Sequence, residues 1–232
     1  MVSSAVKKYA ALCMVCLCSS LFFLGLYQFN NKYSQNTIQA ANGILALSEE
    51  ELQKSPVRFL VSGWAFYPDA LLTPEEIQDE SHYMRYLSIG EQTNFSSPAN
   101  PSPYGCGTYQ MTFFLPERKE AYALEIPEVF SAYNLYLDHD LILQMGEPAQ
   151  GTPLVQNRMV TFHGGKPVTL TIAVSNYDHF YGGIVYPPAF GTMLAVNTTR
   201  GIRFAFCLFS CTVTFVCALL SFYFSRRMKQ KN

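Results

Sequence analysis

Two long apolar segments, one near each end, constrain what this chain can fold into more than any other feature. The first covers residues 9–27, and the second covers residues 202–225, which are uncharged from Phe204 to Ser225. A helix needs roughly 20 apolar residues to cross a hydrocarbon core about 30 Å thick, and both segments are long enough. We therefore predict two transmembrane helices, with the lipid bilayer as a partner of the chain.

Basic residues precede the first segment and follow the second, so they lie between each segment and the nearer end of the chain. They are Lys7, Lys8, Arg226, Arg227, Lys229 and Lys231. Lysine and arginine beside a span tend to remain in the cytoplasm. This pattern predicts a cytoplasmic N-terminus at 1–8, a basic cytoplasmic tail at 226–232 and an extracytoplasmic domain between the spans, anchored in the plasma membrane. Arg200 and Arg203 lie on the outer side of the second span and oppose that orientation, but the four basic residues of the tail outnumber them.

The first segment has two possible fates, as an uncleaved signal anchor or as a cleaved signal peptide. Its uncharged stretch is longer than the roughly 7–15 apolar residues of a signal peptide, and no small-residue cleavage site directly follows Tyr27. Ala40 and Ala41 lie further downstream. These features favour the anchor, with the cleaved peptide as the alternative.

Charge is distributed unevenly along the chain. All 17 Asp and Glu residues lie between Glu49 and Asp178, and residues 28–201 contain nine Lys and Arg, which gives that region a net charge of −8. The whole chain has a net charge of only −1. Because an acidic domain repels phosphate backbones, nucleic acid is excluded as a partner.

Cysteine usage bears on how the middle region is stabilised. Six of the seven cysteines lie in the two apolar segments, and only Cys106 lies between them. One cysteine cannot form an intradomain disulfide, so the region of about 170 residues must rely on a hydrophobic core. No zinc-type spacing of Cys and His occurs, and we expect neither a metal nor another cofactor.

The region 28–56 reads as a linker with a short helix. Its first part is polar, and Ser48 followed by Glu51 forms a capping box that predicts a helix ending before Pro56. Further on, Thr73 followed by Pro74 predicts a helical turn near 74–80.

The region 57–199 has the pattern of an all-β domain. Turn residues separate short runs of β-branched and aromatic residues, and no long helical period intervenes. A long surface loop is expected at 90–107, and a tight connection at Asp138-His139-Asp140 predicts a hairpin. The predicted strands are 57–67, 83–89, 108–115, 121–126, 133–137, 141–144, 155–162, 168–174 and 184–186.

Residues able to carry out catalysis form no recognisable set. Asp and Glu are spread evenly beside predicted turns, no Gly-x-Ser-x-Gly motif occurs, and the four histidines are scattered. Acid–base hydrolysis of a sugar needs two carboxylates placed on either side of the substrate. We therefore predict a protein that is not an enzyme and has no catalytic residues.

One loop after a strong strand has residue types that suit sugar recognition. Aromatic faces stack on apolar sugar faces, and amide and imidazole groups bind hydroxyls. The alternative is that these rings fill the core, which is the stronger interpretation for Trp64. The candidate ligand-binding residues are Asn176, Tyr177, His179 and Tyr181, with Tyr104, His163 and Trp64 as possible neighbours in space.

The order of motifs from 57 to 196 resembles a known fold. Its landmarks are Trp64-Ala65-Phe66, Gly107-Thr108-Tyr109-Gln110, Leu115-Pro116, the strand 132–137 and the strand 168–176. It is similar to the jelly-roll, galactose-binding-like domains that bind sugars in glycoside hydrolases. More closely it resembles the extracellular sensor domain of bacterial seven-transmembrane receptors with diverse intracellular signalling modules. The resemblance implies an antiparallel jelly-roll β-sandwich flanked by two transmembrane helices.

Two departures from that family matter. Its members often have an Asn-Gly-like turn where this chain has Asp138-His139, and they continue into further membrane helices and an output module. This chain ends seven residues after Ser225, which leads us to expect either a piece of a longer receptor or signalling through a partner.

Three functions therefore compete at this stage. The first is a sensory module that binds a small carbohydrate-like ligand and signals through a downstream module, a membrane signalling partner or a homodimer. The second is a cell-surface carbohydrate-binding or adhesion protein whose helices only anchor it. An extracytoplasmic hydrolase is the weakest of the three, because no catalytic constellation is recognisable.

Overall fold

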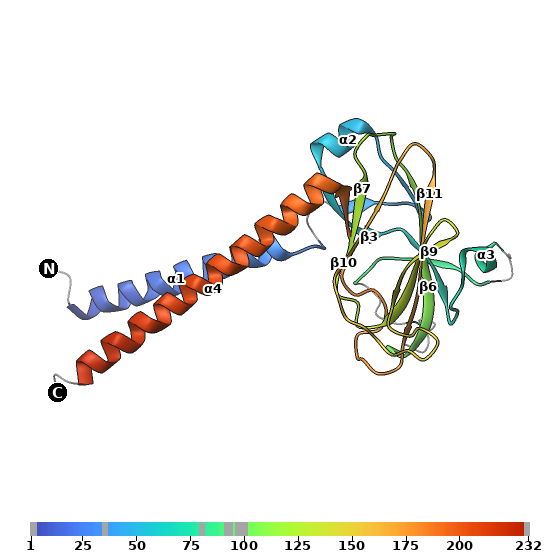
Figure 1. The fold of residues 1–232 in the computed structure, drawn as a ribbon. Coiled ribbons are helices and arrows are strands. Elements are labelled where there is room, and N and C mark those ends of the chain that lie inside the picture. Colours follow the sequence, from blue (N-terminus) through green and yellow to red (C-terminus); the bar gives the residue numbers. More distant parts are fainter. Residues whose placement is uncertain (1–3, 34–36, 79–81, 91–94, 96–101, 230–232) are drawn as a thin grey trace.

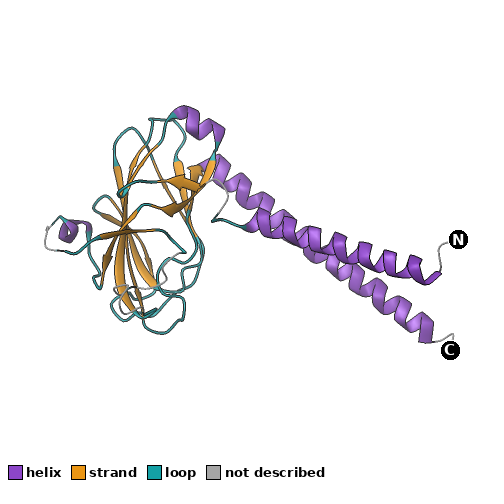
Figure 2. Cartoon of the chain, turned by 180° about the vertical axis from the view of Figure 1, so that it is seen from behind, coloured by secondary structure: helices purple, strands orange, loops and turns teal. Residues whose placement is uncertain are grey.

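The computed structural model describes residues 4–33, 37–78, 82–90, 95 and 102–229. It consists of a β domain from which two long helices, α1 (Ser4–Asn30) and α4 (Met193–Lys229), project in the same direction (Figure 1). Near the domain the helices touch, with the rings of Phe29 and Phe206 at a centroid distance of 5.1 Å. The ends of α1 and α4 that are remote from the β domain lie on the same side of the molecule and spread apart from each other (Figures 1 and 2).

The β domain has two sheets. Strands are antiparallel to their neighbours except in the pairs β1–β3 and β2–β6, which are parallel. The prediction of a mainly antiparallel β-sandwich is therefore confirmed, whereas the jelly-roll connectivity stays a prediction. In spatial order, the five-stranded sheet contains β1 (Thr37–Gln39), β3 (Val57–Ser62), β12 (Ala189–Thr192), β7 (Tyr122–Ile126) and β10 (Arg158–Phe162). The seven-stranded sheet contains β5 (Arg85–Leu87), β4 (Trp64–Pro68), β6 (Gly105–Phe114), β11 (Val168–Asn176), β8 (Ala132–Leu137) and β9 (Asp140–Met145), with β2 (Ile44–Ala46) also paired to β6.

The core between the sheets is rich in aromatic rings. Phe190 of β12 stacks on Phe113 of β6 at a centroid distance of 5.3 Å and on Tyr122 of β7 at 5.7 Å. All three side chains are completely buried. Burying one large apolar side chain contributes about 1.5–3 kcal/mol. The seven cysteines are free, so this packing holds the sandwich together without a disulfide.

The predicted strand 57–67 is two strands in different sheets. The chain leaves β3 and enters β4 at Gly63, whose φ is +81°. A Cβ at this position would lie 2.1 Å from the carbonyl oxygen of Ala40. Both the conformation and the close approach require glycine, so one glycine moves the chain from one sheet to the other.

Two other sequence expectations differ from the structure. The predicted strand 184–186 is wrong, because this segment is irregular and the strand follows it as β12. Pro187 and Pro188 lack the N–H groups that a sheet ladder uses, which keeps this segment out of a regular strand. In the expected linker 28–56, β1 and β2 pair with the sheets. Within the expected loop 90–107, residues 91–94 and 96–101 lie outside the described residues.

Local motifs were predicted more accurately. Helix α2 (Glu49–Lys54) begins with a complete capping box between Ser48 and Glu51, and α3 (Pro74–Ile77) has the same arrangement between Thr73 and Glu76. The β8–β9 hairpin turns at Asp138, whose φ of +53° is tolerated by aspartate.

Both long helices are long and apolar enough to cross a membrane, judged by length and composition. With 27 residues, α1 is about 40 Å long. Helix α4 begins directly after β12, nine residues before the predicted start of the second span at 202. Its first turns lie against the five-stranded sheet, where Val196 is buried beside Val57, Phe59 and Ala189. The chain between the sandwich and the predicted second span is therefore itself helical.

Candidate ligand-binding site

Strand register brings three separate segments together at one end of the seven-stranded sheet. Strand β11 ends at Asn176, which pairs with Gly105 at the start of β6, and Ser175 pairs with Ala132 at the start of β8. The residues before β6, the loop before β8 and the loop after β11 therefore meet at this end.

Asn176 organises the loop that follows it. Its buried side chain donates from Nδ2 to the carbonyl oxygens of Pro103, at 2.8 Å, and His179, at 2.6 Å. Its Oδ1 accepts a hydrogen bond from the backbone N–H of His179 at 3.0 Å. The predicted ligand-binding residue Asn176 is thus fully used in holding the loop, and it faces the interior.

Three rings form a cluster over this loop. His179 stacks on Phe130 with centroids 4.6 Å apart and an angle of 10° between the planes. Tyr181 lies 5.6 Å from His179 and 6.0 Å from Phe130. The backbone N–H of Tyr181 donates to Nδ1 of His179, which leaves Nε2 of the imidazole as the donor that can face a ligand.

Further aromatic side chains are exposed around this cluster. Tyr104, Tyr177 and Tyr181 are about half exposed, and Phe180 is 74% exposed. The ring of Tyr177 packs over Gly151, where a Cβ would lie 2.1 Å from the ring. Four of the predicted residues, Tyr104, Tyr177, His179 and Tyr181, therefore occur at one end of the sandwich with their rings accessible or partly accessible.

Two of the predicted residues lie elsewhere. Trp64 is completely buried and donates its indole N–H to the carbonyl oxygen of Leu60, so it belongs to the core. His163 lies in the loop before β11, at the opposite end of that nine-residue strand and on the order of 25 Å away. Because β11 runs from Val168 to Asn176, His163 lies at the far end of the sheet from the loop that follows Asn176.

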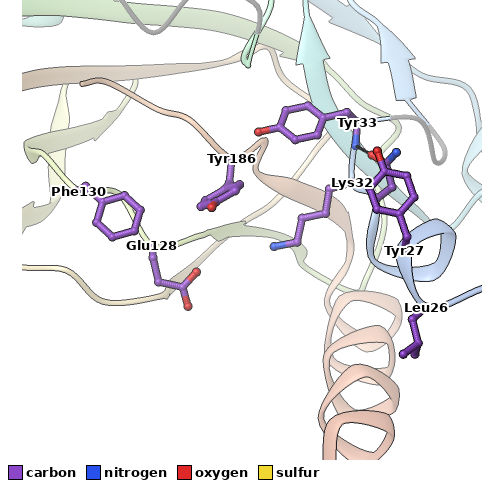
Figure 3. Close-up of a pocket in the computed structure, with 8 residues that line it drawn as sticks. Leu26, Tyr27, Lys32, Tyr33, Glu128, Phe130 and Tyr186 are labelled. Atoms are coloured by element: carbon purple, nitrogen blue, oxygen red, sulfur yellow. Dashed lines mark hydrogen bonds between the residues drawn. The ribbon is translucent and has the colours of Figure 1, made fainter. Parts of the chain in front are cut away.

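A cavity of about 700 Å³ adjoins the aromatic cluster (Figure 3). It lies between the end of α1 and the β domain, and Phe130 is shared by the cluster and the cavity wall. Its lining residues are Leu26, Tyr27, Asn31, Lys32, Tyr33, Glu128, Phe130 and Tyr186.

Charged and hydroxyl groups give this cavity its polarity. Lys32 extends from the turn after α1 toward Tyr186 and Glu128 (Figure 3). Burial, followed by the charge of Arg203, lowers the pKa of the Lys32 ammonium, and Glu125 and Glu128 act in the opposite direction. The hydroxyl of Tyr33 donates to the carbonyl oxygen of Val185 at 2.5 Å and ties this turn to the domain. Burial raises the pKa of that hydroxyl.

One arginine connects both helices to the sandwich. The guanidinium of Arg203 in α4 lies 5.9 Å from the ring centroid of Phe29 in α1 and 5.2 Å from that of Phe59 in β3. Each cation–π contact of this kind contributes about 0.5–2 kcal/mol. A second contact from α4 runs from Arg200 to Glu125 at 3.9 Å.

Sequence reasoning missed Phe130, Lys32 and Glu128. They come from two segments, the turn after α1 and the loop between β7 and β8, that are far from the loop 176–183 in sequence, and no local motif links them. Phe180 was also not among the predicted residues, although it lies inside that loop and is its most exposed ring. Within the described ranges, no group of three or more His, Cys, Asp or Glu side chains could hold a metal ion.

Comparison with known proteins gives structural neighbours only. No protein-family model matches the chain, and no curated protein matches it. The chain is similar to a crystal structure of a β-galacturonidase from Eisenbergiella tayi, with 14% identity, a TM-score of 0.42, and coverage of 58% of this chain and 24% of the enzyme. It is also similar to the Faecalibacterium prausnitzii β-glucuronidase, with 17% identity, a TM-score of 0.41, and coverage of 60% and 32%.

A further neighbour is a glycosyl hydrolase family 2 member from Bacteroides cellulosilyticus, with 11% identity, a TM-score of 0.45, and coverage of 59% and 20%. The chain thus spans between a fifth and a third of the length of these enzymes. All three neighbours are glycoside hydrolases, the enzyme class named by the sequence resemblance. The resemblance to bacterial receptor sensors stays a prediction.

Proposed function

We propose that this chain is the membrane-anchored, extracytoplasmic ligand-binding module of a signal-transduction receptor, and that it binds a small carbohydrate without turning it over. The observation that carries this proposal is the cluster of Phe130, His179 and Tyr181, surrounded by exposed aromatic rings at one end of the sandwich. Aromatic faces pack against the C–H faces of a sugar ring, and the Tyr181 hydroxyl and His179 Nε2 can bind its hydroxyls.

The signalling part of the proposal rests on how the helices join the domain. Helix α4 continues directly from β12, and Arg203 contacts both α1 and β3. These contacts favour a sensory module over an adhesion protein with passive anchors, because a change in the sandwich would be transmitted to both helices. Such coupling requires a ligand that binds one arrangement of the domain more tightly than another.

The experiment is a glycan screen of the full chain in nanodiscs, followed by titration of the glycans that bind. We expect Tyr181→Ala to weaken glycan binding about tenfold, as loss of one stacked ring predicts. Phe114→Ala is the matched control, because Phe114 and Tyr181 are both 44% exposed and Phe114 lies at the opposite end of β6. Absence of any bound glycan, or equal losses in the two variants, would contradict the proposal.

A further inference from the structure

The cavity beside α1 has a feature that the sugar-binding proposal does not use. Its walls carry opposite charges, Lys32 from the turn after α1 and Glu128 from the loop between β7 and β8. Phe130 and Tyr186 lie on the Glu128 side of the cavity (Figure 3). Leu26 and Tyr27, from the last turns of α1, complete the side that faces the helix.

Neither charge is neutralised by an ion pair within the described part of the chain. Lys32 is partly buried, and the resulting loss of hydration lowers the pKa of its ammonium. A partly dehydrated cation gains more from an anionic ligand group than an exposed one does. Glu128 is exposed and can accept a cationic group. The cavity is therefore complementary to a molecule that carries both an anion and a cation.

The rings next to Glu128 narrow the choice of cation. An ammonium group that contacts a carboxylate and lies over aromatic faces gains both ionic and cation–π attraction. Phe130 and Tyr186 offer such faces on the wall opposite Lys32 (Figure 3). The arrangement thus accommodates a compact zwitterion, with its anionic end on Lys32 and its ammonium end on the Glu128 side.

The position of the cavity along α1 indicates where such a molecule would come from. A helix of 27 residues is about 40 Å long, which matches a bilayer of about 40–45 Å including its headgroups. If α1 spans the membrane, the turn containing Lys32 lies at the depth of the outer headgroups. Leu26 and Tyr27 then line the side of the cavity nearest the bilayer.

We propose that this cavity binds the headgroup of a zwitterionic phospholipid, with the phosphate on Lys32 and the ammonium between Glu128, Phe130 and Tyr186. The lipid would join α1 to the β domain at the membrane surface. Its presence would therefore influence the relative position of the helices and the sandwich. This site adjoins the proposed sugar site, and the Phe130 ring is the one named residue that the two have in common.

The test uses the purified full chain in detergent and native mass spectrometry of retained lipid. Phosphatidylethanolamine and phosphatidylglycerol with identical acyl chains are added separately. Both carry the phosphate, and only phosphatidylethanolamine carries the ammonium. We expect the wild type to retain phosphatidylethanolamine about tenfold more strongly, as one charge-assisted contact predicts.

Two variants distinguish the contributions of Lys32 and Glu128 to lipid binding. Lys32→Met should weaken retention of both lipids about tenfold, whereas Glu128→Gln should abolish the preference for phosphatidylethanolamine. Lys166→Met and Glu120→Gln are matched controls, since both residues are exposed and lie outside the cavity. Thermal unfolding of each variant verifies that it is folded.

Three outcomes would overturn the proposal. The first is equal retention of the two lipids by the wild type, and the second is unchanged lipid retention by Lys32→Met. The third is binding of glycerophosphoethanolamine, which lacks the acyl chains, as tightly as the whole lipid. The last result would assign the cavity to a soluble zwitterion. Lipid retention and glycan titration are separate measurements, so failure of one proposal leaves the other testable.

Discussion

At the scale of single residues, the interior of the sandwich contains an apparent mismatch. Tyr133 is completely buried, and its hydroxyl has no hydrogen-bond partner among the described residues. A buried hydroxyl without a partner costs free energy, because it gives up its hydrogen bonds to water. Burial also raises the pKa of Tyr133 to about 12, since the charged form is disfavoured. The same cause raises the pKa of Tyr109 to about 12.

Tyr133→Phe should therefore stabilise the domain by about 1 kcal/mol at neutral pH. It should also reduce the loss of stability at alkaline pH. An unfolded tyrosine ionises near pH 10, whereas Tyr133 stays protonated up to about pH 12, so stability falls as pH rises through this window. Urea unfolding at neutral pH and at about pH 11 measures both effects. Tyr83→Phe, at a position that is 69% exposed, is the control, and a Tyr133→Phe variant less stable than the wild type would contradict the prediction.

At the scale of elements, the base of α4 is the place where the sandwich and a long helix share one core. Val196 is 1% exposed among apolar side chains of the five-stranded sheet, whereas Leu194, two residues earlier, is 69% exposed. The attachment of α4 to the sandwich therefore depends on the buried face of its first turns.

Val196→Ala should lower stability by about 1–2 kcal/mol, because it removes two buried methyl groups and leaves a small void. Amide hydrogen exchange in residues 193–203 should also become faster, since the first turns of α4 lose their anchor. Leu194→Ala should change neither quantity. Similar exchange rates in the two variants would show that α4 is not held through Val196.

Features that depend on contacts between residues close in sequence were predicted, whereas features that depend on contacts between distant residues were not. The helix caps at Ser48 and Thr73 were predicted because their hydrogen bonds connect residues three apart. The change of sheet at Gly63 was missed because it depends on the carbonyl oxygen of Ala40, which is distant in sequence. Strand β12 was missed because its four residues are too few to show a strand pattern. At the candidate site, the loop after β11 was recognisable, but Phe130 and Lys32 join it through tertiary packing alone.

At the scale of the whole molecule, the two helices have matched dimensions. Helix α1 is about 40 Å long, and the part of α4 from Arg203 to Lys229 has the same number of residues as α1. The first turns of α4, up to Arg203, lie beside the sandwich, and the outer ends of α1 and α4 both lie on the side away from it (Figure 1). This geometry fits two crossings of one bilayer in opposite directions, with the basic ends on one side and the acidic domain on the other.

We therefore predict that antibodies bind epitope tags at both chain ends only after the cells are permeabilised. A cysteine at Lys166→Cys, in an exposed loop of the sandwich, should react with a membrane-impermeant maleimide in intact cells. The wild type, whose seven cysteines are free, gives the background labelling. An N-terminal tag missing from the mature protein would instead identify the first segment as a cleaved signal peptide. A tag accessible in intact cells would refute the arrangement, because the positive charges beside the spans would then lie outside.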